Sequence, residues 1–250
     1  MDKDLFDVAV VGAGVVGAAT ALGCAQLGLK VAWVGPAPQP FVPSAQAPFD
    51  ARIYALSPGS VALAERLKVW AAIPPAQQQA VMRMEVFGDA SAQLVFDAYE
   101  ACAQQLATIV QSCDLERAFQ TGCGFSPTIT RFEVPAQCIR FESAQATVQL
   151  DSGQALRAGL VVGADGLRSE VRAAAGITAQ ERLYGQSAMV TNLACERPHR
   201  ATAFQWFTPQ GVIALLPLPA CAQAAHAVSL VWSAPQALAE TLRLLTPQDL

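Results

Sequence analysis

The sequence is short of charged residues and of histidine, and each shortage argues against a class of function. The 16 lysines and arginines are outnumbered by 20 aspartates and glutamates, so no excess of positive charge is available to bind a nucleic-acid backbone. Two histidines are too few for catalysis built on several imidazoles. Only 14% of the residues are charged and 53% are hydrophobic, whereas disordered chains have the reverse composition. We therefore expect a folded protein that does not bind nucleic acid.

The seven cysteines lie far apart, and no C-x-x-C pair is present. An odd and dispersed set is typical of reduced thiols in a cytoplasmic protein rather than of a disulfide framework or a zinc site. The uncharged segment 8–29 is rich in glycine and alanine and follows the acidic residues MDKDLFD, which is unlike a signal peptide or a membrane span. We expect no metal site and a cytoplasmic location.

The first 35 residues predict a strand, a helix and a second strand. Asp7–Gly12 and Leu29–Val34 are short apolar runs of the kind found in buried parallel strands. Between them, Gly14–Leu27 is rich in alanine and leucine and is followed by Gly28, a residue type that often ends helices. The pattern predicts a βαβ unit, and 250 residues are enough for one large domain or two modest ones.

The rest of the chain predicts a mixture of helices and strands. Residues 138–160 contain three short strand patterns with a turn at 151–153, which predicts a β-meander. Further helices are expected over 59–70, 99–119 and 236–245, and further strands over 81–87, 93–96, 186–194, 201–207, 211–218 and 227–232.

Residues 12–17 (GAGVVG) form a G-x-G-x-x-G motif between the first strand and the helix. In dinucleotide-binding folds the first glycine allows a tight turn, the second lets a pyrophosphate approach the backbone, and the third lets helix and strand pack closely. The helix N-terminus adds unpaired N–H groups and the positive end of the helix dipole. We predict that Gly12, Gly14, Val16 and Gly17 bind the pyrophosphate of a dinucleotide.

The acid that usually follows the second strand of such a fold is absent. That acid accepts hydrogen bonds from a ribose, but here Val34 is followed by Gly35, and the nearest acid downstream is Asp50. A charge-assisted hydrogen bond contributes about 1.5–3 kcal/mol, so we expect weaker binding of the ribose. We also expect that a glutamate introduced at position 35 improves cofactor affinity.

Two further motifs, together with the glycine motif, carry a family resemblance. They are Asp50–Ser60 (DARIYALSPGS) and Gly163–Arg172 (GADGLRSEVR), and residues 184–186 (YGQ) lead to a predicted strand pair over 207–218. Over nearly its whole length the sequence resembles the flavin-dependent aromatic hydroxylases of ubiquinone biosynthesis, the UbiH/UbiI/VisC family.

The resemblance implies an α/β fold with two parts. One is an FAD/NAD(P)-binding, Rossmann-like parallel sheet with a β-meander, and the other is a strand-rich substrate domain. The implied FAD-binding domain comprises residues 1–75 and 100–178, and the implied substrate domain comprises residues 76–99 and 179–250.

In function, the resemblance implies an FAD-dependent monooxygenase that uses NAD(P)H and O2 to hydroxylate an aromatic ring of a prenylated phenol. It implies that Arg52 approaches FAD and that Asp165 and Gly166 lie near FAD and NAD(P)H, although an ordinary turn is the alternative interpretation of that pair. A hydrophobic phenolic substrate, other quinone-biosynthesis proteins and a peripheral contact with the inner membrane are the implied partners. No catalytic residue is identified, and the aromatic residues of 204–207 fit a substrate cavity or an ordinary sheet core equally well.

The family's G-D-A-A-H motif, which covers FAD, is absent from the sequence. The resemblance therefore implies the N-terminal part of such a chain, with an incomplete substrate domain. We expect this form to bind FAD weakly or to purify without it, and not to couple NAD(P)H oxidation to hydroxylation. Two alternatives remain open: a non-catalytic flavoprotein-like subunit that acts through protein contacts, and a nicotinamide dehydrogenase, which leaves residues 50–60 and 163–172 unexplained.

Overall fold

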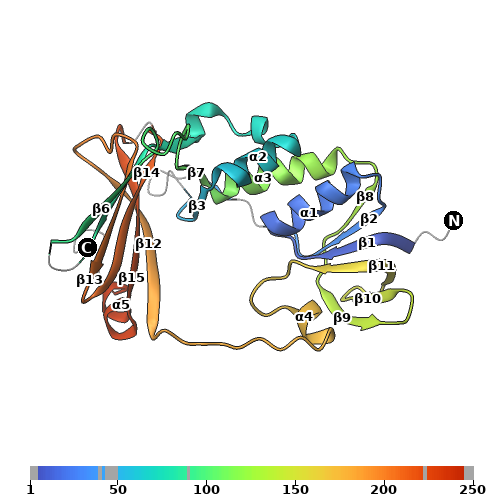
Figure 1. Cartoon of the computed structure of the whole chain (residues 1–250). Coiled ribbons are helices and arrows are strands. Elements are labelled where there is room, and N and C mark those ends of the chain that lie inside the picture. The colour runs from blue at the N-terminus through green and yellow to red at the C-terminus, as the bar shows by residue number, and fades with distance from the viewer. Residues whose placement is uncertain (1–4, 39–40, 43–49, 89–90, 222–223, 245–250) are drawn as a thin grey trace. The chain divides into compact units, whose positions relative to one another are not determined.

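The computed structural model describes residues 5–38, 41–42, 50–88, 91–221 and 224–244, and its contacts divide the chain into two compact units (Figure 1). Both units combine segments that are distant in sequence. The first unit comprises Met1–Pro40, Leu63–Ala72 and Asp114–Gln180, and the second comprises Phe41–Ala62, Ile73–Cys113 and Glu181–Leu250.

Six strands form the sheet of the first unit. They are β1 (Leu5–Val11), β2 (Val31–Val34), β8 (Ile129–Phe132), β9 (Ala136–Phe141), β10 (Ala146–Leu150) and β11 (Ala155–Gly163). Their order is β8-β2-β1-β11-β10-β9. β1 pairs in parallel with β2 and β11, β2 pairs in parallel with β8, and β10 pairs antiparallel with β9 and β11. The predicted Rossmann-like parallel sheet and β-meander are confirmed.

Among the described residues, three α-helices belong wholly or mainly to the first unit: α1 (Val15–Gln26), α3 (Ser112–Gly124) and the short α4 (Glu170–Ala174). Figure 1 shows α1 and α3 along one face of the sheet. The four residues of β2 are all buried, as expected for a strand covered on both faces. α1 packs on the sheet through small or aliphatic residues, so the helix and the strands approach closely. These residues are Gly17, Ala18, Ala21, Leu22 and Ala25.

The carboxyl ends of the parallel strands meet at one edge of this sheet. β1, β2 and β8 run in the same direction and end level with one another, because Val11 pairs with Val34 and Val34 pairs with Phe132. The residues that follow them are also connected, since the Gly12 N–H donates to the Val34 carbonyl over 2.8 Å and the Gly35 N–H donates to the Phe132 carbonyl over 3.0 Å. In open α/β sheets this edge is where ligands bind.

The second unit contains a six-stranded sheet in the order β12-β15-β14-β13-β5-β6 and a three-stranded sheet in the order β3-β7-β4. The helix α5 (Gln236–Leu242) follows the last strand, and α2 (Pro58–Arg66) has residues in both units. All four strands predicted beyond residue 183 are confirmed. The strands of this unit are β3 (Ile53–Leu56), β4 (Gln79–Val81), β5 (Arg83–Phe87), β6 (Gln93–Asp97), β7 (Ala107–Gln111), β12 (Gln186–Ala194), β13 (Thr202–Thr208), β14 (Gly211–Leu218) and β15 (Ala227–Pro235).

The helix predicted over 99–119 is wrong in its first half. The strand β7 occupies Ala107–Gln111, and the helix α3 begins only at Ser112. Thr108, Ile109 and Val110 are buried in the central strand of the three-stranded sheet. β-branched side chains favour such a position, and tertiary packing overrides the helix propensity of the neighbouring residues.

The longest described helix, α3, has 13 residues, whereas about 20 are needed to cross a bilayer. Within the described part of the chain, no helix is long and apolar enough to span a membrane.

We predict that Leu156→Ala destabilises the first unit by about 2–5 kcal/mol, because it leaves a cavity in a fully buried position. Leu160→Ala is the matched control: it makes the same substitution in β11 at a residue that is 56% exposed, so its effect should stay within about 0.5 kcal/mol. Urea unfolding followed by circular dichroism measures both. Equal losses of stability in the two variants would contradict the packing described for β11.

Candidate dinucleotide-binding site

Gly12 and Gly17 bring three backbone segments into contact. A Cβ atom on Gly12 would lie 2.0 Å from the carbonyl oxygen of Ala164, and a Cβ atom on Gly17 would lie 2.0 Å from the carbonyl oxygen of Gly12. Gly12 also has a φ of +128°, which side chains rarely adopt. These two glycines therefore allow the strand-to-helix turn to form and to pack against the end of β11.

Gly14 differs from the other two glycines of the motif because, apart from its own backbone surroundings along the chain, no atom of the described residues lies within 4 Å of its Cβ position. It is the N-cap residue of α1, and it offers no side chain to the helix terminus. The first turn of α1 contains no acidic residue, so the positive end of the helix dipole is not neutralised there. An open space beside unpaired N–H groups fits an anionic group such as a pyrophosphate.

Asp165 and Gly166 lie next to this turn. The Ala164 N–H donates to the Val11 carbonyl over 2.7 Å, and the Cβ of a side chain at Gly12 would come within 2.9 Å of the Asp165 nitrogen. The structure thus brings Gly12, Gly14, Val16, Gly17, Asp165 and Gly166 together within the first unit.

The Asp165 carboxylate has a structural role in this position. Its Oδ2 atom accepts hydrogen bonds from the backbone N–H groups of Glu170 (2.7 Å) and Val171 (3.2 Å), at the start of α4. Burial raises the pKa of Asp165, but hydrogen bonds from Ser169 and from backbone N–H groups outweigh burial and hold the pKa below its ordinary value. The resemblance did not reveal this helix-capping role.

Arg52 lies in the second unit, immediately before β3. Asp50 fixes the Arg52 backbone, because Asp50 Oδ1 accepts from the Arg52 N–H over 3.0 Å and Oδ2 accepts from the Cys113 N–H over 3.1 Å. Asp50 is itself held by Gln111, whose side chain accepts from the Asp50 N–H, and by Asn192, which donates to the Asp50 carbonyl. That Arg52 approaches a cofactor stays a prediction. The motif alone did not identify Asn192 as part of this cluster.

The backbone at position 35 has no room for the glutamate that we expected to improve cofactor affinity. Gly35 has a φ of +153°, and its Cβ would lie 2.9 Å from the backbone nitrogen of Ala13. A glutamate at this position would push against the glycine motif itself. The expectation that such a substitution improves cofactor affinity is therefore wrong.

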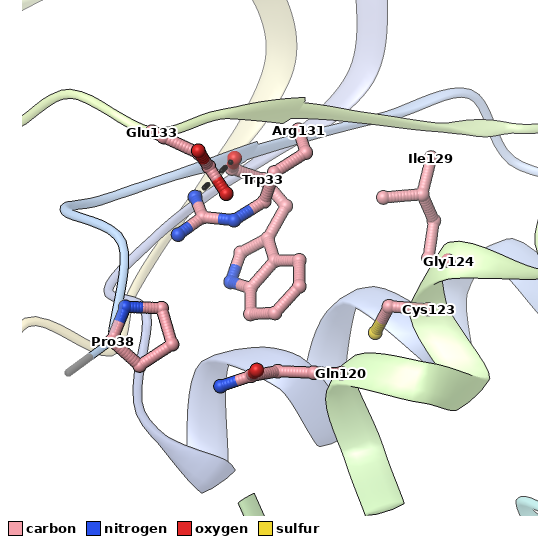
Figure 2. A pocket seen from close by; sticks show the side chains of 8 residues that line it. All are labelled: Trp33, Pro38, Gln120, Cys123, Gly124, Ile129, Arg131 and Glu133. Atoms are coloured by element: carbon pink, nitrogen blue, oxygen red, sulfur yellow. Dashed lines mark hydrogen bonds between the residues drawn. The ribbon is translucent and has the colours of Figure 1, made fainter. Parts of the chain in front are cut away.

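A pocket of about 290 Å³ lies in the first unit near the carboxyl edge of the sheet (Figure 2). The indole of Trp33 forms one wall and donates to the Gly12 carbonyl over 2.9 Å, which links the pocket to the glycine motif. The Arg131 guanidinium lies 4.3 Å from the centre of the Trp33 ring. The lining residues are Trp33, Pro38, Gln120, Cys123, Gly124, Ile129, Arg131 and Glu133.

Arg131 is held in place by backbone carbonyls. Its guanidinium donates to the carbonyls of Trp33 (3.0 Å), Phe132 (2.8 Å) and Pro36 (3.1 Å). Burial lowers the pKa of Arg131, and the negative charge of Glu133 opposes this effect. No sequence motif indicated this pocket, because its residues come from β2, α3, β8 and the segments that follow β2 and β8, and meet only in the folded chain.

The aromatic residues of β13 fall on both faces of their sheet. Phe204 and Trp206 stack with ring centres 5.8 Å apart, and Trp206 also stacks on Phe87 of the neighbouring strand β5 at 5.5 Å. Phe207 is on the opposite face and is half exposed. The stacked row stabilises pairing between the strands.

Known proteins resemble this chain in sequence and in fold. The family model described as "FAD binding domain" matches residues 6–243. The 3-demethoxyubiquinol 3-hydroxylase of Escherichia coli is 37% identical over 222 residues, which are 87% of this chain and 56% of that protein. The ubiquinone hydroxylase UbiL of Rhodospirillum rubrum is 32% identical over 230 residues, which are 91% of this chain and 51% of that protein.

A solved structure of similar fold is that of Pseudomonas aeruginosa PqsL in complex with 2-aminobenzoylacetate. It has a TM-score of 0.75 and 24% sequence identity, and the match covers 95% of this chain and 63% of that one. The chain spans about half the length of the curated relatives that it matches.

We predict that the glycines of the motif differ in their effects on stability. Gly17→Ala should lower the free energy of unfolding by about 1–3 kcal/mol, because the added methyl group overlaps the Gly12 carbonyl. Gly14→Val meets open space and alters only an N-cap residue, so its cost should be about 1 kcal/mol or less. Thermal or urea unfolding tests this, and a larger loss in Gly14→Val than in Gly17→Ala would contradict the geometry.

A second prediction concerns pH. Because the folded pKa of Asp165 is lowered, its ionised form stabilises the folded state above the ordinary pKa of 3.8, and this contribution is lost as the pH falls through the folded pKa. Parent protein should be more stable than Asp165→Asn at pH 7, and the difference should narrow below pH 3.8. Urea unfolding at several pH values measures the difference, and a gap that stays constant down to the lowest pH would refute the capping role.

Proposed function

Because the chain belongs to the FAD-binding family that includes the ubiquinone hydroxylases, we propose that it acts in a monooxygenase that hydroxylates an aromatic ring in ubiquinone biosynthesis. The observation that carries the proposal is the open space beside Gly14 at the N-terminus of α1. It lies in a turn whose other glycines are closely packed, within the segment that matches the FAD-binding family model.

FAD is the cofactor of this family, and the residues present fit its pyrophosphate. In the proposal, backbone N–H groups at Gly14, Val16 and Gly17 bind the phosphates, while Gly12 lets the turn form. The turn that contains Asp165 and Gly166 packs against Gly12 through the backbone of Ala164 and Asp165. Bound FAD supplies redox chemistry with NAD(P)H and O2. The task of these residues is to bind and orient the cofactor.

The proposed substrate is a hydrophobic phenol from the quinone pathway. The support comes from the names of the curated relatives, a 3-demethoxyubiquinol 3-hydroxylase and a ubiquinone hydroxylase. The proposed substrate domain comprises residues 76–99 and 179–250, which contain the six-stranded sheet of the second unit. Contacts with other quinone-biosynthesis proteins and with a membrane surface are part of the same proposal, because such a substrate partitions into lipid.

The alternative interpretations are less well supported. A nicotinamide dehydrogenase leaves unexplained the match of residues 6–243 to an FAD-binding family. A non-catalytic subunit is not favoured either, because the relatives named above are hydroxylases.

Flavin binding by the purified chain tests the proposal. We expect FAD to bind the parent, and binding is followed as a change in flavin fluorescence. Gly14→Val should lose binding because its branched side chain fills the space for the pyrophosphate. Gly14→Ala should give an intermediate affinity. Unfolding curves for each variant separate loss of the site from loss of the fold. Equal affinity for FAD in the parent and in folded Gly14→Val would exclude this cofactor site.

A further inference from the structure

A dinucleotide site of this type needs an acceptor for the ribose hydroxyls, and position 35 cannot supply one. The usual acceptor is a carboxylate at the end of the strand that follows the glycine-motif helix. Here that strand is β2, and the residue after it is Gly35. Its backbone conformation and the contact with Ala13 leave no room for a side chain. The acceptor must therefore come from another strand end.

The end of β8 is the adjacent one. β8 pairs in parallel with β2, and the Gly35 N–H donates to the Phe132 carbonyl, so the residue after Phe132 lies one strand away from position 35. Neighbouring strands are about 5 Å apart. That residue is Glu133, whose side chain is exposed and longer than an aspartate. A carboxylate is therefore present at the same edge, shifted by one strand.

Glu133 also lines the pocket beside Trp33, together with Gln120 and Arg131. Figure 2 shows Glu133 and Arg131 on one side of the indole, with Pro38 and Gln120 on the other. Arg131 donates hydrogen bonds to three backbone carbonyls and contacts the Trp33 ring, so its side chain is fixed and forms a wall of the pocket. By contrast, the side chains of Glu133 and Gln120 have no hydrogen-bond partner among the residues that the structure describes.

The size and the walls of the pocket fit part of a dinucleotide. A volume of about 290 Å³ is at the small end of ligand pockets, which suits a nucleoside rather than a whole cofactor. The Arg131 guanidinium covers one face of the Trp33 indole, so a base would stack on a planar surface outside that contact, and the Gln120 amide can both donate and accept. The Trp33 hydrogen bond to Gly12 connects this pocket to the motif that would hold the pyrophosphate.

We infer that Glu133, at the end of β8, supplies the carboxylate that accepts hydrogen bonds from the ribose of the adenosine half of FAD, at the Trp33 pocket. The inference rests on the proposed function, because it assumes that the chain binds FAD. It assigns to β8 the role that β2 has in the usual arrangement. Arg131 then serves as a positioning residue, since its positive charge lies beside the carboxylate and its hydrogen bonds join the ends of β2 and β8.

Binding of ADP, which carries the adenosine and pyrophosphate without the flavin, tests the inference by isothermal titration calorimetry. Glu133→Gln keeps the size of the side chain but removes the charge, so we expect ADP affinity to fall about tenfold or more. The control is Glu142→Gln, the same substitution directly after β9. β8 and β9 are the two outermost strands of the six-stranded sheet, on opposite sides of it. The control variant should bind ADP as the parent does.

Analogues without ribose hydroxyls separate recognition of the ribose from a general effect on the fold. The parent should bind 2′,3′-dideoxy-ADP about tenfold or more weakly than ADP, and Glu133→Gln should bind the two ligands nearly equally. If Glu133→Gln binds ADP but discriminates between the ligands as the parent does, the inference is overturned and FAD binding stands. If the parent binds neither ADP nor FAD, both the inference and the proposed function are overturned.

Discussion

The close approach of three backbone segments at Gly12 is the contact on which the candidate site depends. The Gly12 carbonyl lies where a Cβ at position 17 would be, and the Ala164 carbonyl lies where a Cβ at position 12 would be. Any other residue at either position separates the turn from α1 or from β11. This packing orients the N-terminus of α1 toward the carboxyl edge of the sheet, and so creates the open space beside Gly14.

The same close packing limits which positions at the carboxyl edge of the sheet can carry a polar side chain. Gly35 is pressed against Ala13, so the strand end nearest to the glycine motif carries no side chain. Next to this strand end, polar and charged groups come from the neighbouring strand β8, where Arg131 ties two strand ends together and Glu133 lines the pocket. A group that is absent at one strand end can thus be replaced from the next, because parallel strands end at the same edge.

Local patterns sufficed to predict the parallel strands, the β-meander and the strands beyond residue 183, because each forms a short apolar run bounded by turn residues. They failed at β7, since its burial between β3 and β4 depends on partners distant in sequence. The glycine motif was predictable because backbone packing requires glycine itself. The Trp33 pocket and the Asn192 contact with Asp50 were not, as they join segments about 100 and 142 residues apart.

Backbone groups do most of the positioning in both units, which explains how a chain with few charges and two histidines can carry a cofactor site. The glycine motif offers N–H groups, Asp165 caps a helix, and Asp50 fixes the Arg52 backbone through paired hydrogen bonds. Such contacts orient the main chain before any ligand binds, which lowers the entropic cost of binding. In this family FAD supplies the reactive group, so the protein needs accurate placement more than it needs reactive side chains.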